Sequence, residues 1–153
     1  MEALIQCANG LLADISQPKE KNSSPGQSKR YFKMIDYILK KIVLVCINNL
    51  DFGLLQWNFI SAFFISLCFN KNQQIRDEAI EHIGKFVEEI FKNKQESLNS
   101  KKEQDVMGLY LELAKSQIKS IEYEIIEQLK GVMPRIKQQT ALMDGFRIVK
   151  IFS

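Results

Sequence analysis

The sequence is poor in the residues from which catalytic and metal sites are built. It has one histidine, His82, and three cysteines among 153 residues. It has no CxxC pair, no HExxH, no glycine-rich phosphate loop and no GxSxG motif. A metal site needs clustered ligands, and nucleophilic catalysis needs a nucleophile beside its base. We therefore predict no enzyme activity, no catalytic residue, no metal site and no cofactor, and we interpret His82 as a partly exposed packing or hydrogen-bonding residue of a helix.

The cysteines also bear on the compartment. There is an odd number of cysteines, and they are widely spaced and set among apolar neighbours. They are Cys7, Cys46 and Cys68. This pattern favours buried thiols in a reducing compartment over a disulfide framework. A secretory signal is not visible, because the N-terminus lacks a basic region ahead of an apolar stretch. The expected location is the cytoplasm.

Long apolar runs are missing as well. The most apolar segment, Leu54–Phe69, is interrupted by Gln56, Asn58, Ser61 and Ser66. A membrane-crossing helix needs roughly 18 or more apolar residues in succession, so this segment is interpreted as a buried core helix. An exposed aromatic groove for a partner is the alternative for its aromatic residues, which are Trp57, Phe63 and Phe64.

The net charge is only +3, but it is unevenly distributed. Cations dominate Lys19–Lys41 and Lys130–Lys150, whereas anions dominate Asp77–Glu89. Such alternation is typical of solvated helix faces, and only a contiguous basic groove would imply nucleic acid or an anionic membrane. A contact with an anionic surface is considered for three residues, with seating of the helix through Tyr31 and Phe32 as the alternative. These three residues are Lys29, Arg30 and Lys33.

What the sequence has in abundance is apolar residues at helical spacing, without the alternation of half-buried strands. We predict an all-α protein with an N-terminal helix over 1–15, a flexible linker over 16–29 that carries Pro18, Pro25 and Gly26, and a helical segment over 30–153. Within that segment, helices are expected at about 30–49, 54–69, 73–92, 104–116 and 139–152, and another is expected from Ser120 as N-cap until Gly131 and Pro134 end it. An exposed loop is expected over 93–103. The apolar stripes of the last four helices are Ile75, Ala79, Ile83, Phe86 or Val87, and Ile90; Val106, Leu109, Tyr110 and Leu113; Ile121, Ile125, Leu129 and Val132; and Leu142, Phe146, Val149 and Ile151.

An internal repeat is visible between two of these helices. The pattern of Ile75–Gly84 recurs in Ile121–Lys130, at an offset of 46 residues. The preceding helices agree, since the same offset takes Leu67 to Leu113. Periods of about 40–47 residues are typical of HEAT and armadillo arrays.

The segment Asn72–Gly84 resembles the inner-helix signature of HEAT repeats, in which an aliphatic-Arg pair is followed by Ala and then by an aliphatic-Gly pair. The matching residues are Ile75, Arg76, Ala79, Ile83 and Gly84. The resemblance implies a right-handed α-solenoid of antiparallel helix pairs, HEAT/armadillo-like, with about six to seven helices. Small residues let helices approach closely, and Arg76 is expected to reach a carboxylate at the corresponding turn of a neighbouring unit.

The second copy departs from this signature. It has Glu122 in place of the arginine, Ile125 in place of the small residue and Lys130 in place of the glycine. A regular ladder of charges along the array is therefore not expected.

A narrower resemblance covers Trp57–Phe91 and extends to Phe152. This stretch resembles the helical repeats of large Golgi and endosomal Arf guanine-nucleotide exchange factors, and of their relatives that lack the exchange domain. The resemblance implies a cytosolic scaffold that is recruited to Golgi or endosomal membranes and binds trafficking partners. Exchange activity is not implied, because the exchange domain is not present in this sequence.

These observations predict a non-catalytic scaffold for protein–protein interaction. The chain reaches Ser153 without a polar finishing segment, so we expect a segment of a larger array. The expected partners are other proteins, with peripheral membrane contact and without a small-molecule substrate; nucleic acid is not the expected partner. The alternative is a HEAT-type module of nucleic-acid-associated or nuclear-transport machinery.

Overall fold

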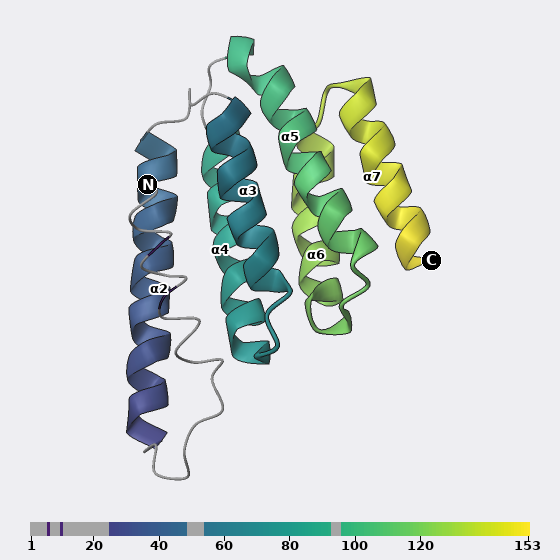
Figure 1. Ribbon diagram of the computed structural model, residues 1–153. Helices are drawn as coiled ribbons and strands as arrows, with labels where there is room; N and C mark the ends of the chain where they lie inside the picture. Colours follow the sequence, from purple (N-terminus) through teal and green to yellow (C-terminus); the bar gives the residue numbers. More distant parts are fainter. Residues whose placement is uncertain (1–5, 7–9, 11–24, 49–53, 93–95) are drawn as a thin grey trace. The chain divides into compact units, whose positions relative to one another are not determined.

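The computed structural model describes residues 25–48, 54–92 and 96–153, together with Gln6 and Gly10, and all regular secondary structure in these ranges is helical (Figure 1). The prediction of an all-α protein is thus confirmed for the described residues. The predicted helix over 1–15 and most of the predicted linker over 16–29 lie outside them. The elements are α2 (Pro25–Asn48), α3 (Leu54–Cys68), α4 (Gln73–Lys92), α5 (Glu96–Lys115), α6 (Lys119–Val132), the 3-10 helix η1 (Met133–Arg135) and α7 (Gln139–Phe152).

The chain divides into two compact units, Met1–Asn49 and Leu50–Ser153. The predicted helical segment over 30–153 therefore spans both units. In the first unit, α2 begins at Pro25 and not near Arg30, so the last part of the predicted linker is helical. Proline suits the first turn of a helix, where its missing N–H would have no helical partner.

In the second unit, α3 buries its aromatic residues. Phe63 and Phe64 are buried, and the Phe64 ring stacks on Phe86 of α4 with 6.3 Å between the ring centroids. Core packing is therefore confirmed for these two residues, while the Trp57 side chain lies outside the described ones. Among the described helices, none combines the length and the apolarity that crossing a membrane requires.

Helix α4 has the predicted bounds and the predicted buried stripe. His82, however, is only 1% exposed, so the prediction of a partly exposed histidine is wrong. The reason is that α4 buries a broad face, on which His82 lies with Ala79 and Phe86. The His82 Nε2 atom lies 3.9 Å from the Glu78 carboxylate one turn earlier.

The largest difference from the sequence prediction is the start of α5. The predicted loop over 93–103 is helical from Glu96 onward. Its residues from Glu96 onward include glutamate, lysine and leucine, which have good helix propensity, and a polar composition alone does not make a loop. The remaining part of that loop, 93–95, lies outside the described residues.

The start of α6 also differs. Its N-cap is Ile118, whereas Ser120 was predicted. The Ser120 hydroxyl instead accepts a hydrogen bond of 2.9 Å from Arg76 Nε of α4. At its other end, α6 passes through Gly131 and is followed by η1, which contains Pro134.

The helices of the second unit form two layers, with α3, α5 and α7 in front of α4 and α6 in the view of Figure 1. Within the front layer α5 packs on α3 and on α7, and within the back layer α4 packs on α6. Helices α3 and α4 also pack on each other, as do α5 and α6. The core lies between the layers and includes Phe64, Ile83, Tyr110, Leu113 and Ile125.

Candidate binding groove between α6 and α7

An open apolar groove of about 660 Å³ lies between α6, η1 and α7. We call it the α6–α7 groove. Its wall consists of aliphatic, aromatic, methionine and proline side chains, apart from one lysine and one serine. The lining residues are Ile126, Leu129, Lys130, Met133, Pro134, Leu142, Ile148, Val149, Phe152 and Ser153.

The groove continues onto exposed apolar residues of α7. Phe146 is 61% exposed and Val149 is 53% exposed, and Met143 is exposed on the same helix. Phe146 lies three residues before Val149 and four after Leu142, so these side chains share one edge of α7. Exposed apolar residues that adjoin an apolar groove are typical of an interaction surface.

Helix α7 does not bury the apolar stripe that the sequence pattern identified. The buried residues are Ala141, Asp144, Gly145 and Ile148. The close packing of α7 against the rest of the second unit explains why this face is buried. A Cβ atom on Gly145 would lie 2.8 Å from the Met133 Cε atom, so α7 presents its small residues to the core. The larger side chains, among them Phe146, are consequently turned outward.

Glu103 of α5 holds the N-terminus of α7. Its buried carboxylate accepts hydrogen bonds from the backbone N–H groups of Lys137 and Gln138, the latter at 2.9 Å. Gln138 is the N-cap of α7 and makes no capping hydrogen bond with its own side chain. A carboxylate at a helix N-terminus satisfies N–H groups and interacts favourably with the helix dipole. Glu103 therefore fixes one side of the α6–α7 groove.

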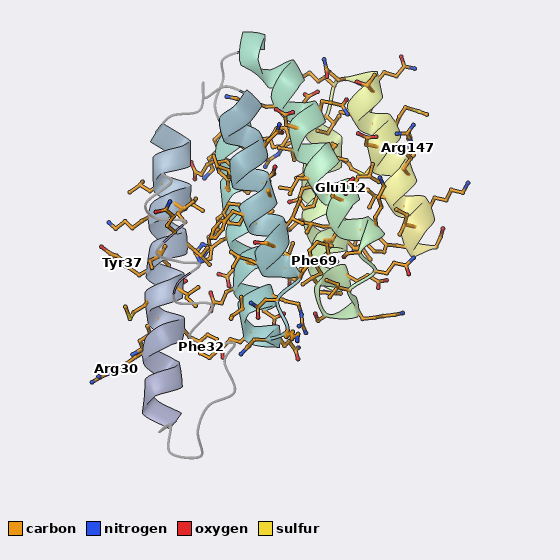
Figure 2. All side chains as sticks on the ribbon, in the orientation of Figure 1. Arg30, Phe32, Tyr37, Phe69, Glu112 and Arg147 are labelled. Atoms are coloured by element: carbon orange, nitrogen blue, oxygen red, sulfur yellow. The ribbon has the colours of Figure 1, made fainter. Side chains whose placement is uncertain are left out.

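A second polar contact joins α5 to α7. Gln104 Nε2 donates to Asp144 Oδ2 at 2.7 Å, and Arg147 donates to the other carboxylate oxygen at 3.0 Å. Asp144 is buried, so its charge needs these partners. The hydrogen bond between Gln104 and Asp144 orients α7 on α5. Most of the Arg147 side chain lies in solvent, as Figure 2 shows.

The opposite wall is positioned by Gln128 of α6. Tyr110 of α5 donates to Gln128 Oε1 at 2.7 Å, and Gln128 Nε2 donates to the Ile80 carbonyl of α4 at 2.8 Å. Burial, and to a smaller extent the nearby Glu88 carboxylate, raise the pKa of Tyr110, so its hydroxyl stays protonated and can donate. One amide thus links α4, α5 and α6.

The surroundings of the groove are basic. From Leu129 to Ser153 the chain has one anion, Asp144, which is buried and bonded as described. The cations of this range are all exposed and comprise Lys130, Arg135, Lys137, Arg147 and Lys150. Two of these cations are paired with carboxylates from outside the range: Lys130 with Glu127 at 2.7 Å, a hydrogen bond that raises the pKa of Lys130, and Arg135 with Glu88 at 3.1 Å.

The predicted signature residues lie in α4, outside the groove. Ile75, Ala79 and Ile83 are fully buried. Arg76 does not reach a carboxylate among the contacts described: it donates to the Ser120 hydroxyl and to the carbonyls of Asn70 and Lys71. A hydrogen bond replaces the expected ion pair, because the residue that lies next to Arg76 Nε is Ser120, which has a hydroxyl and not a carboxylate.

The residues predicted to contact an anionic surface belong to the first unit, whereas the α6–α7 groove belongs to the second. Arg30 and Lys33 are exposed on α2, and the side chain of Lys29 lies outside the described ones. Figure 2 labels Arg30 on this helix. These residues and the groove are therefore separate candidates.

Comparisons of the chain with protein-family models, with curated proteins and with solved structures found no match. The site is thus defined by its geometry. The sequence held one signal for it: Asp144 and Gly145 interrupt the apolar pattern of α7. A polar residue beside a glycine, both buried, marks the side of the helix that packs closely, and places the apolar stripe on the other side.

Proposed function

We propose that this chain is a non-catalytic scaffold that binds other proteins, and that the α6–α7 groove is its binding site. The exposed apolar edge of α7 carries the proposal. Phe146 and Val149 are each more than half exposed and adjoin a groove with an almost wholly apolar wall. Water-exposed apolar area of this kind is unfavourable in an isolated molecule and becomes favourable when a partner covers it.

The finer architecture that we propose is a HEAT-type α-solenoid. In it, α3–α4 and α5–α6 are two antiparallel helix pairs, and α7 follows them in the layer of α3 and α5. The burial of matched positions supports this view. Residues 46 apart, such as Ile75 and Ile121 or Leu67 and Leu113, are buried in both proposed repeats. Repeat arrays of this kind act through extended binding surfaces.

The cellular setting that we propose is the cytosolic side of Golgi or endosomal membranes, where the chain, as part of a larger protein, would bind vesicle-trafficking factors. The support is the resemblance of Trp57–Phe152 to the repeats of large Arf exchange factors. The alternative, a module of nucleic-acid-associated or nuclear-transport machinery, is favoured by the exposed cations of Lys130–Lys150.

Affinity capture with the full chain tests the scaffold function. We would immobilise the wild-type chain and its Phe146→Asp variant, incubate both with cytosol, and quantify the bound proteins by mass spectrometry. We expect a set of proteins that the wild type retains and the variant loses. Phe69→Asp is the matched control, because Phe69 is an exposed aromatic residue of the same unit at the end of α3 (Figure 2).

Two outcomes would contradict the proposal. One is a bound set that Phe69→Asp and Phe146→Asp reduce equally, since the groove would then have no special role. The other is salt-sensitive binding of RNA with no protein retained through the groove, which would favour the nucleic-acid alternative. Circular dichroism and urea denaturation of each variant show whether loss of binding reflects loss of folding.

A further inference from the structure

Helix α6 shows what the α6–α7 groove is shaped to accept. It lies against α4 of its own layer and α5 of the other layer. It fills that place with a stripe of aliphatic side chains at intervals of three and four residues. These residues are Ile121, Ile125, Leu129 and Val132, and all are buried.

The groove would place an added helix between the same kinds of neighbours that α6 has, one helix further along the two layers. Its walls are α6 from the back layer and α7 from the front layer, and α7 packs on α5 as α5 packs on α3. An incoming helix would thus meet one helix from each layer, as α6 does. A channel between two helices with apolar walls is the geometry in which amphipathic helices bind. The groove therefore continues an interface that the molecule already uses.

The charges around the groove restrict which helix fits. Lys130 lies on the α6 wall, and Lys150 is exposed on α7, four residues after Phe146. Asp144, the one anion from Leu129 to Ser153, is buried and bonded to Gln104 and Arg147. Glu127 offsets Lys130 at 2.7 Å and Glu88 offsets Arg135 at 3.1 Å, but Lys137 and Lys150 add further exposed positive charge. The net charge near the groove is therefore positive, which favours carboxylates and disfavours a second set of lysines.

We infer that the α6–α7 groove binds an acidic amphipathic α-helix of a partner protein, seated beside α6 and α7 as α6 is seated beside α4 and α5. This inference rests on the proposed function and adds the chemistry of the partner. The helix has aliphatic residues spaced as in α6, and glutamates or aspartates that flank them face Lys130 and Lys150. A lipid bilayer suits the site less well, because the lining of the α6–α7 groove is concave, whereas a membrane contact needs a protruding apolar surface.

Designed peptides test the inference directly. We would synthesise a helical peptide of 14 residues, the length of α6, with the apolar stripe of α6 and glutamate at the flanking positions. A second peptide has the same stripe with lysine at those positions, and a third has glutamates with the stripe residues scrambled. Binding of each to the full chain is measured by fluorescence polarisation, and the bound face is mapped by NMR shift changes.

We expect the acidic peptide to bind at α6 and α7, and to bind at least about tenfold more tightly than the lysine peptide, which corresponds to about 1.4 kcal/mol. Raising the salt concentration should weaken the acidic peptide more than the lysine peptide. The charge reversals Lys130→Glu and Lys150→Glu should reduce or invert this preference while they leave the apolar wall intact. Val149→Asp should abolish binding of both, and Phe69→Asp should change neither.

The results separate failure of this inference from failure of the proposed function. If both peptides bind the groove equally, the groove is a binding site but the acidic chemistry is wrong. If neither binds and Phe146→Asp loses no protein from cytosol, both proposals are wrong. A dimer that Val149→Asp dissociates, or groove-dependent binding to vesicles of phosphatidylcholine and phosphatidylserine, would overturn the inference in favour of a second copy or a membrane.

Discussion

The side-chain amide of Gln128 occupies the space in which a side chain on Gly84 would have to lie. An ideal Cβ atom at Gly84 would be 2.7 Å from Gln128 Nε2, closer than such atoms approach. The amide cannot simply move aside, because it is bonded to Tyr110 and to the Ile80 carbonyl. Glycine at position 84 is therefore explained by one hydrogen-bonded amide of the neighbouring helix.

This relationship predicts the effect of Gly84→Ala. Alanine improves helix propensity by about 0.5–1 kcal/mol, but displacing Gln128 loses hydrogen bonds of about 0.5–1.5 kcal/mol each. We expect a net loss of about 1 kcal/mol in the free energy of unfolding, measured by urea denaturation. Gly108→Ala is the control, since a Cβ there meets nothing within 4 Å, and it should stabilise the chain.

A double mutant identifies the cause of that loss. In a Gln128→Ala background the obstruction is gone, so Gly84→Ala should stabilise the chain about as much as Gly108→Ala does. If Gly84→Ala remains destabilising in that background, Gln128 is not the reason for the glycine.

The capping role of Glu103 leads to a second prediction. Glu103→Gln keeps the shape of the side chain but removes its charge and replaces one of the carboxylate oxygens, which accept from the backbone N–H groups of Lys137 and Gln138, by an NH2 group that can only donate. Losing a helix cap costs about 0.5–2 kcal/mol, so we expect a loss of that size. Hydrogen exchange should quicken in the first turn of α7. Glu112→Gln serves as control, because Glu112 is exposed and pairs with Lys115, an interaction worth less than about 1 kcal/mol. Equal effects of the two substitutions would argue against the cap.

The sequence predicts α4 and α7 with the correct bounds, because each has strong helical periodicity between polar turns. It does not predict which face of α7 is buried. That choice depends on the fit of Gly145 against Met133 and on the bonding of Asp144 by Gln104, which are contacts between residues far apart in the chain. The α6–α7 groove follows from the same choice, and for this reason the apolar pattern of α7 alone did not predict it.

The start of α5 was missed for a related reason. The largely polar composition of 93–103 predicts a loop, whereas 96–103 form the first turns of a helix. Glu103 is one of them, and it is buried because it caps α7. A local sequence pattern cannot distinguish a solvent-exposed glutamate from a buried one that accepts hydrogen bonds from the N-terminus of a helix elsewhere in the chain.

A third prediction concerns the turn between α5 and α6. Gln117 has a φ of 55°, in the left-handed region that costs a residue with a Cβ atom roughly 1–2 kcal/mol. Gln117→Gly removes this cost and adds backbone entropy to the unfolded chain, so we expect a net gain of up to about 1 kcal/mol. Gln139→Gly, in the first turn of α7 with ordinary backbone angles, should instead lower stability. Urea denaturation measures both, and a loss at position 117 would show that the Gln117 side chain makes contacts that outweigh the strain.

The last prediction concerns the reactivity of Cys68. Burial raises the pKa of its thiol from 9.0 to about 12, and the thiolate is the form that reacts. At pH 8 the thiolate fraction is therefore about a thousandfold lower than at the ordinary pKa, so the folded chain should resist iodoacetamide at this position. Unfolding in urea removes the burial and should restore rapid alkylation. Peptide mapping by mass spectrometry follows Cys68 separately from the other cysteines. Rapid alkylation of Cys68 in the folded chain would mean that α3 opens locally to solvent, because a thiol at the α3–α4 core can otherwise ionise only when that core separates.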